Sequence, residues 1–362
     1  MATLSPFRVK LWDMDGPTRG RGNQVAFIDD AKDIGVSAYA NEGGEMFFTI
    51  PAIHPQVAEI APWLRHYEVS RFDTDTNTYT VLGVGLIDDY DATEDEVIVY
   101  GRDYLSLFDA SISAATQSYT AATYSSIIQA ELSLAITQPS STDLSVTKHI
   151  SLGSISSVST TTTVLTSFQS RLEFIRQLME MLASDGILRP IVKVSRGSPF
   201  TVTFEANAGA DREDIRLEYG GSVNGFRFNP GFGDFATEVW SIGQKREGAT
   251  LLFSNQTYAS KGLYGIIQQS TVVVDVIDQT ALDNSTKRFA RNVGTPNKNL
   301  SMRIRPGVIK PVTGWDIADS VRVVIDRGAV NINALYTVWG WEWIGKKNGS
   351  EELFLDLLPK QT

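Results

Sequence analysis

Apolar and polar residues alternate with a period of two near the start of the chain, where Phe7, Val9 and Leu11 are separated by Arg8 and Lys10. Further apolar runs that predict strands follow at residues 36–40, 46–50 and 97–100. A period of two predicts strands with one buried face and one exposed face. Short strands separated by regular turns favour a barrel or a sandwich over a βαβ fold.

A five-residue motif occurs near both ends of the chain. Residues 79–83 read Tyr-Thr-Val-Leu-Gly, and residues 336–340 read Tyr-Thr-Val-Trp-Gly. Each motif follows a strand-like run, at 67–72 or at 321–325, and each precedes a polar turn and a further apolar strand. The shared order of segments predicts that one β module is present twice.

The period changes to that of a helix in the middle of the chain. Residues 170–184 carry one apolar stripe, Ser170 and Glu173 form a capping box, and Gly186 is a C-terminal stop signal. A second helix is predicted at 282–289, before Gly294 and Pro296. Strands are predicted at 191–194, 200–205, 215–219, 226–228, 238–242 and 271–277.

Residues 113–166 are rich in Ser and Thr. Their charged residues are limited to Glu131, Asp143 and Lys148. Such a segment has little apolar surface to offset the entropy that ordering costs, so we predict a loop or a weakly ordered insertion. The apolar residues at 127–135 are compatible with a short helix inside it.

A chain of 362 residues suggests two or three domains, at ~150 residues per domain. We predict a mainly β (α+β) fold with two similar small β-barrel modules near the termini and a mixed α+β domain between them. Residues 1–112 form the first barrel module, which ends in a short helix at 104–112. The insertion at 113–166 and the middle domain at 167–298 follow, and residues 299–362 form the second barrel module.

The net charge of −10 excludes a surface built to neutralise phosphates, because nucleic-acid affinity comes largely from clustered Lys and Arg. The chain has no cysteine, so disulfides, thiolate metal sites and a Cys nucleophile are excluded. We see no secretory signal and no run of ~20 apolar residues that would span a membrane. These observations predict a soluble protein made in a cytoplasm.

Two acidic segments are candidates for cation binding. Residues 73–77 imitate the start of an EF-hand loop, but Thr78 stands in place of the required Gly and Val84 in place of the bidentate Glu. We therefore predict a polar hairpin turn. Six carboxylates crowd the turn at 88–96, and we predict a solvated charged loop there because no apolar pocket accompanies it. They are Asp88, Asp89, Asp91, Glu94, Asp95 and Glu96.

The remaining candidates for chemistry lack a complete motif. His54, His66 and His149 lie far apart and in no metal-binding spacing. A Ser-x-x-Lys pattern at 145–148 has no accompanying motif, and the glycines between 220 and 233 look like tight turns without a phosphate-binding loop. We therefore predict no catalytic residue, no cofactor and no metal site.

Trp339, Trp341 and Trp343 lie two residues apart. On a regular strand their three rings project from one face. That face is either the core of a barrel or a subunit interface, where Trp is enriched. A sugar-binding platform is a third reading.

The order of segments resembles the minor tail or baseplate hub proteins of long-tailed, siphovirus-type phages that infect actinobacteria. Residues 97–105 lead from a strand through a Gly-x-Asp-like turn into a leucine-rich helix, as in the first barrel of that family. The capped helix at 172–182 and the strands at 202–205 and 217–223 follow in the same succession. The closing segment, 300–359, is similar to the second barrel. The Ser/Thr-rich insertion departs from this pattern.

The resemblance implies a structural virion protein of the tail tip with no enzymatic activity. It implies a homotrimeric ring whose six barrels match a six-fold tail tube to three-fold tip components and let DNA pass without specific binding. The implied partners are distal tail and tail-tube proteins, the tape measure protein and a fibre or spike. The implied location is the virion, after synthesis in the cytoplasm of the host bacterium. Two alternatives stay open, a cell-wall or glycan hydrolase that uses residues 88–96 and a carbohydrate-binding adhesin that uses the Trp strand.

Overall fold

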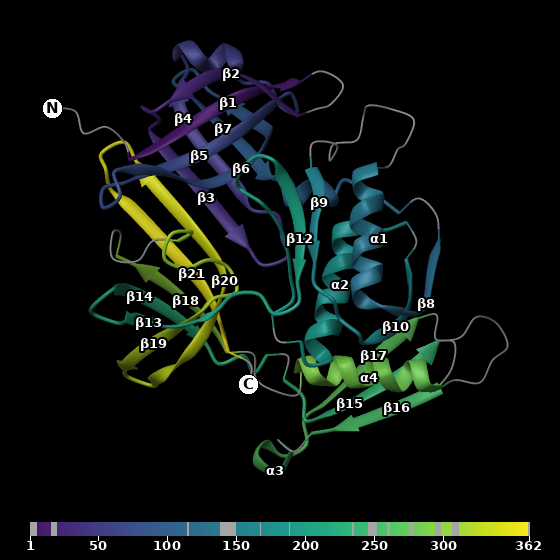
Figure 1. Cartoon of the computed structure of the whole chain (residues 1–362). Coiled ribbons are helices and arrows are strands. Elements are labelled where there is room, and N and C mark those ends of the chain that lie inside the picture. Colours follow the sequence, from purple (N-terminus) through teal and green to yellow (C-terminus); the bar gives the residue numbers. More distant parts are fainter. Residues whose placement is uncertain are drawn as a thin grey trace. The chain divides into compact units, whose positions relative to one another are not determined.

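Strands predominate in the computed structural model of the chain (Figure 1), so the predicted mainly β class is confirmed. The structure describes residues 6–15, 20–113, 116–137, 150–166, 168–187, 189–233, 235–244, 252–258, 261–274, 279–293, 298–305 and 311–360.

Thirteen strands form one large sheet. They are β1 (Phe7–Asp15), β2 (Gly20–Ile28), β3 (Asp33–Tyr39), β4 (Glu45–Pro51), β5 (Arg65–Asp73), β6 (Thr78–Ala92), β7 (Glu96–Asp103), β13 (Asp211–Glu218), β14 (Val223–Asn229), β18 (Asn299–Ile304), β19 (Ser320–Arg327), β20 (Val330–Lys346) and β21 (Glu351–Pro359). The order is β14-β18-β21-β20-β3-β4-β7-β6-β5-β1-β2, and β13 joins through β19, which pairs with β20.

Strands from both ends of the chain share this sheet because β20 pairs with β3. The pairing is antiparallel and runs from Gly340 opposite Tyr39 to Lys346 opposite Asp33. Within the described residues the strand order is open at its ends, so these strands form one sheet and no closed barrel. The sequence predicts two separate barrels, because a period of two identifies strands but does not specify which distant strands pair.

The repeated motif lies in two similar three-stranded meanders. The first copy is in β6, which pairs with β5 and β7, and the second is in β20, which pairs with β19 and β21. All four pairings are antiparallel, and both middle strands are long, with 15 and 17 residues. The predicted order of strands around the motif is therefore the same at both ends of the chain.

The described chain divides into two compact units. Unit 1 comprises Met1–Ala183, Ile187–Phe226 and Ser301–Thr362, and unit 2 comprises Ser184–Gly186 and Arg227–Leu300. These units group residues by contact. The division of the sequence into four segments, at 112, 166 and 298, stays a prediction.

Much of the Ser/Thr-rich segment is regular structure inside unit 1. It contains β8 (Gln117–Thr123), α1 (Tyr124–Thr137), β9 (Ile150–Ile155) and β10 (Thr161–Thr166). The predicted loop is wrong for these residues, and the predicted short helix is confirmed. The reason is spacing, because Tyr124, Ile127, Ile128, Leu132 and Ala135 of α1 fall on one stripe that is buried in the core.

The helix α2 (Arg171–Ser184) packs in the same core as α1. The Ser170 hydroxyl accepts a hydrogen bond from the Glu173 backbone N–H, and Gly186 has a φ of +95° after the last turn. The Ser170 cap and the Gly186 stop signal are confirmed. Unit 1 also contains β11 (Ile191–Val194) and β12 (Phe200–Glu205), which form a three-stranded sheet with β9. The short 3-10 helices η2 (Pro55–Glu59) and η3 (Tyr104–Phe108) complete its described elements.

Unit 2 contains a three-stranded sheet covered on one face by a helix. β15 (Glu238–Gln244) lies between β16 (Leu252–Thr257) and β17 (Gln268–Val274). The predicted helix at 282–289 is confirmed as α4 (Gln279–Val293), and a short helix, α3 (Lys261–Tyr264), precedes β17. Val239, Ala290 and Val293 meet in a small core between the sheet and α4.

Gly85 allows β6 to approach β7 closely. A Cβ atom at this position would lie 1.9 Å from the Arg102 carbonyl oxygen, which is backbone and has little freedom to move. We expect Gly85→Ala to destabilise the protein by about 2 kcal/mol or more, because the two strands must separate. Urea denaturation of this variant and of Gly225→Ala, whose Cβ would meet nothing within 4 Å, checks this result. Equal stability of the two variants would contradict the close approach.

Candidate functional site

The Trp strand, β20, is irregular at its centre. Val338 pairs with Leu357 and Gly340 with Asp356, so a bulge leaves Trp339 without an opposite residue. Trp341 and Trp343 are 1% exposed, whereas Trp339 is 39% exposed. The prediction that all three rings share one environment is wrong, because the bulge interrupts the alternation that places residues i and i+2 on one face.

Trp343 connects the C-terminal strands to β1 and β5. Its ring meets Phe7 edge-on at 5.7 Å, and its indole N–H donates to Glu351 Oε2 at 2.9 Å. Glu351 also accepts two hydrogen bonds from Arg71, which lies over the Trp343 ring. Trp341 and Trp343 are therefore core residues. Two buried rings offer no platform to a sugar, so the reading of this strand as an adhesin loses its basis.

Acidic side chains cross the opposite face of β20. Glu342 lies between the two buried tryptophans in sequence and projects to the other side of the sheet, opposite Ser37 of β3. Ser37 is hydrogen-bonded to the Glu45 backbone on β4, and Asp356 on β21 lies opposite Gly340. We call Glu45, Glu342 and Asp356 the acidic stripe. It crosses four neighbouring strands from both ends of the chain.

The carboxylates of the acidic stripe influence one another. Partial burial raises the pKa of Glu342, and the charges of Asp356 and Glu45 raise it further. Burial and the same three carboxylates raise the pKa of the neighbouring Tyr39 phenol. A group of like charges on an open sheet face repels anions and attracts cations.

The six acidic residues at 88–96 lie at the end of the β6–β7 hairpin. β6 continues to Ala92, because Asp89 and Asp91 pair with Tyr100 and Ile98 of β7, so the turn is shorter than the sequence predicts. The group is largely exposed. The predicted solvated charge is confirmed, and these residues form no apolar pocket of the kind that a hydrolase acid requires.

Within the hairpin, ion pairs neutralise two of the six carboxylates. Arg102 binds Asp88 at 2.6 Å, and Lys32 binds Glu96 at 2.8 Å. The Arg102–Asp88 pair lies beside Glu45, since Arg102 is opposite Glu45 in the ladder of β4 and β7. The hairpin therefore places a neutralised pair beside Glu45 at this end of the acidic stripe.

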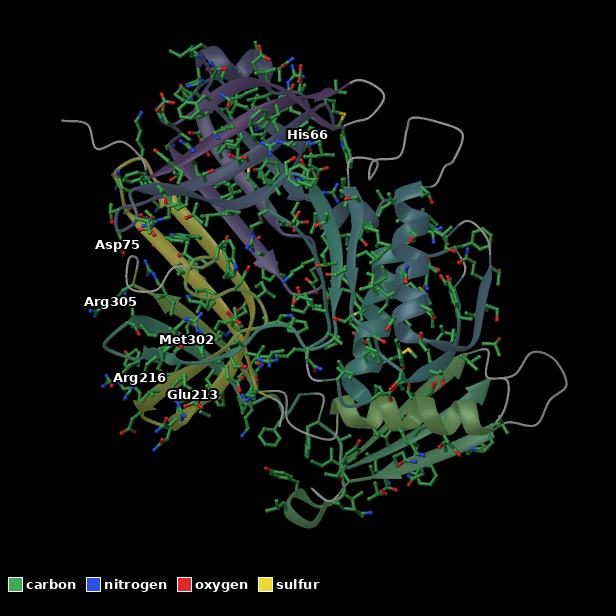
Figure 2. The ribbon with its side chains drawn as sticks, viewed as in Figure 1. His66, Asp75, Glu213, Arg216, Met302 and Arg305 are labelled. Carbon is green, nitrogen blue, oxygen red and sulfur yellow. The ribbon has the colours of Figure 1, made fainter. Side chains whose placement is uncertain are left out.

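The histidines have structural surroundings where the structure describes them. His66 is fully buried and its Nδ1 lies 2.7 Å from the Tyr104 hydroxyl (Figure 2). His54 caps η2 and lies 3.1 Å from Asp30. His149 and the Ser-x-x-Lys pattern at 145–148 lie outside the described residues.

The segment at 73–77 is a hairpin turn, as predicted, and the glycines between 220 and 233 lie between strands, except Gly225 in β14. Asp75 lies in the turn between β5 and β6 (Figure 2), and its N–H donates to the Asp73 carboxylate. Gly220 and Gly231 have φ of +86° and +73°, which suits glycine in tight turns. In the described part of the chain no group of three His, Asp or Glu side chains is arranged to hold a metal ion.

A cavity of about 360 Å³ lies within unit 1, lined in part by Asp103, Tyr67, Leu105, Arg196 and Asp316. The Asp103 carboxylate caps η3 by accepting the Ser106 N–H at 3.1 Å. Burial raises the pKa of Asp103 to about 6, although backbone N–H donors and Arg196 act in the opposite direction.

We expect the free energy of unfolding to fall as the pH rises from about 4 to about 6, as far as Asp103 contributes. The folded state then holds a proton on Asp103 that the unfolded state has released, and ionisation removes this advantage. Asp103→Asn keeps the capping oxygen and should flatten this part of the profile. Urea denaturation of both proteins at several pH values between 4 and 7 measures the difference. Identical slopes would exclude the buried carboxyl as their cause.

None of the helices in the described parts of the chain is long and apolar enough to cross a membrane.

Neither a protein-family model nor a curated protein sequence matches the chain. Solved structures do match. The 43 kDa tail protein of prophage MuSo2 from Shewanella oneidensis is 11% identical, with a TM-score of 0.62 over 98% of both chains. A tail protein from Neisseria meningitidis MC58 is 13% identical, with a TM-score of 0.59 over 97% of this chain and 96% of that one.

The chain has the fold of phage tail proteins. A third match, the prophage tail protein gp18 from Listeria monocytogenes EGD-e, is 12% identical, with a TM-score of 0.56 over 98% of this chain and 95% of that one. At such low identities the likeness concerns the fold alone. The likeness extends over nearly the whole of each chain, so it is not limited to the large sheet.

Proposed function

We propose that this protein is a structural component of a phage tail tip, a baseplate hub without enzymatic activity. Three copies form a ring, and the two related meanders of each copy present six similar modules to a six-fold tail tube. The ring binds distal tail or tail-tube proteins and the tape measure protein on one side and a fibre or spike on the other. It resides in the virion and is made in the cytoplasm of the host.

The observation that carries this proposal is the fold likeness to phage tail proteins over 98% of both chains. The meanders β5-β6-β7 and β19-β20-β21 add support, because a ring of three subunits can match a six-fold tube when each subunit presents two similar surfaces. The pairing of β20 with β3 fixes the two strand sets relative to each other within one sheet.

The proposed ring lets DNA pass along the acidic stripe. Residues 1–112 contain 8 Lys and Arg against 19 Asp and Glu, and Glu45 from this segment shares one sheet face with Glu342 and Asp356. A wall of this sign repels phosphates and prevents DNA from binding during ejection. A positive channel surface in the assembled ring would contradict this role.

The proposed location is tested by labelling intact virions with antibodies against the purified chain. We expect label at the end of the tail opposite the head. In a separate zymogram, the purified chain should produce no clearing of host cell walls. Label on the capsid, or absence of the chain from purified virions, would contradict the proposed function. A clearing zone made by the purified chain would favour the hydrolase.

Charge reversal in the acidic stripe gives a further expected result. The triple variant Glu45→Lys/Glu342→Lys/Asp356→Lys should bind duplex DNA at low salt, whereas the wild-type chain should not. Because each lysine can neutralise a phosphate, the affinity should fall steeply with salt, with a slope of about −0.9 per phosphate contact. Fluorescence anisotropy at several salt concentrations measures it, and Glu213→Lys/Asp214→Lys/Glu218→Lys on the exposed β13 strand is the control for added charge.

A further inference from the structure

Unit 2 exposes an unusual amount of apolar side chain. It comprises about a fifth of the chain, yet it holds eight of the nineteen large apolar residues that are exposed in the described structure. They are Phe232, Trp240, Phe253, Leu263, Tyr264, Ile266, Ile267 and Val272. Scattered exposed apolar residues need no explanation, whereas a concentration of them marks an interaction surface.

Trp240, Phe253 and Val272 share the face of the sheet that α4 leaves open. In the ladder, the partly buried Ile242 lies opposite Phe253 of β16 and beside Val272 of β17, so these side chains form a row across the sheet. Trp240 precedes this row by two residues on the same face. The side chains of alternate residues, Val239 and Ser241, are buried on the α4 side. The open face is therefore apolar along its centre.

The apolar surface continues onto α3 and the loop after it. Lys261, the first residue of α3, and Gln268, the first of β17, both reach the Glu238 carboxylate, which lies on the open face. Leu263 is 83% exposed and Ile266 is 64% exposed just beyond this contact. We call the open sheet face together with residues 263–267 the unit 2 face.

The Tyr264 ring holds this loop against the rest of unit 2. It packs edge-on against Phe232 at 5.6 Å and against the buried Phe235 at 5.2 Å. The exposed side chains therefore stand on a fixed support. A preformed apolar surface loses little entropy when a partner covers it.

The unit 2 face is large enough for a protein partner. It contains seven of the eight exposed residues, all except Phe232. They present on the order of 700 Å² of apolar side chain, if about half of the ~150–250 Å² that a large side chain can bury is exposed in each. This exceeds the ~300–600 Å² of the largest patch on a typical monomer and is close to the ~800 Å² that each partner contributes to a standard interface.

We infer that the unit 2 face packs against a second copy of this chain. The inference rests on the proposed ring of identical subunits. The chain as a whole carries a charge of −10 and repels its own copies, whereas the only described carboxylate of this face, Glu238, is paired with Lys261. Two copies can meet here without like-charge repulsion. A surface built for lipid carries a rim of Lys and Arg that are free to bind headgroups, whereas Lys261 on this face is paired with Glu238. The ladder partners of Trp240 are the uncharged Asn255 and Ser270.

The test compares three full-length proteins by sedimentation equilibrium across a wide range of concentration. In the double variant Trp240→Glu/Ile266→Glu two exposed positions acquire charge, so the fold should survive, and near-UV circular dichroism together with the melting temperature checks this. We expect the wild-type chain to associate and the variant to need at least ~100-fold more protein for the same degree of association, as for two central interface residues. Ile53→Glu, at a 93% exposed residue of unit 1, should associate like the wild type.

The outcomes separate this inference from the proposed function. Association of the variant at wild-type concentrations overturns the inference, and a wild-type trimer would then be held by other surfaces. A wild-type chain that stays monomeric also overturns the inference, while its presence in labelled virion tails would leave the proposed function standing. Binding of the wild type, but not of the variant, to phosphatidylglycerol vesicles would assign the unit 2 face to lipid and overturn self-association.

Discussion

Glu131→Gln should destabilise the protein by about 3–5 kcal/mol, the largest effect that we expect from a change of charge alone. Glu131 on α1 and Arg171 at the start of α2 form an ion pair inside the core of unit 1, with exposed fractions of 0% and 2%. The Tyr119 hydroxyl donates to the same carboxylate at 2.7 Å. Glutamine has nearly the same shape, so its main effect is to remove the negative charge that Glu131 places beside the buried guanidinium of Arg171.

Urea denaturation followed by far-UV circular dichroism measures this loss. The double variant Glu131→Gln/Arg171→Met should regain most of the stability, because both charges are then absent from the core. The matched control is Glu205→Gln, which removes the carboxylate of an exposed pair with Lys193 and should cost less than about 1 kcal/mol. A loss of less than 1 kcal/mol for Glu131→Gln would show that water reaches the pair.

Trp343→Ala should cost about 3–5 kcal/mol, as expected for a buried Trp truncated in a packed core. The truncation would open a cavity between β20 and β1, where Trp343 meets Phe7. It would also remove the hydrogen bond that the indole N–H donates to Glu351. We expect the melting temperature to fall and the junction of the N- and C-terminal strands to lose protection against amide hydrogen exchange first.

Trp339→Ala is the matched control for this prediction. Trp339 and Trp343 are both tryptophans of β20, but Trp339 is partly exposed at the bulge. Its truncation should cost about 1 kcal/mol or less. Similar losses for Trp339→Ala and Trp343→Ala would contradict the assignment of Trp343 to the core.

The strands and helices were largely predictable from local pattern. The strands at 191–194 and 200–205 and the helix at 282–289 are present, with small differences in their ends. The capped helix α2 begins and ends where its Ser170 and Gly186 signals indicate. Periodicity and end signals depend on neighbouring residues, so one sequence contains enough information to predict them.

The Ser/Thr-rich segment shows where composition misleads. Its polar average predicts a loop, but the positions of Ile127, Ile128 and Leu132 place them together on the buried stripe of α1. The sequence gives no sign that Glu131 is buried, whereas the structure buries it against Arg171, forty residues away. No local signal identifies that partner.

The candidate site was predictable only in its parts. The sequence identifies the acidic residues at 88–96, and it gives no reason to group Glu45 with Glu342 and Asp356. The register of β20 on β3 and β21 makes them neighbours. The open face of unit 2 likewise depends on which side of the sheet α4 covers.

Three properties follow from the amino-acid sequence alone: the mainly β class, the strand motif that recurs near both ends, and the acidic charge. These properties depend on the identity and spacing of adjacent residues. The folded structure was needed to show that the two strand sets join in one sheet, that a bulge separates Trp339 from Trp341 and Trp343, and that the acidic stripe exists. Each of these depends on hydrogen bonds between residues far apart in the chain, and side-chain periodicity does not specify such partners.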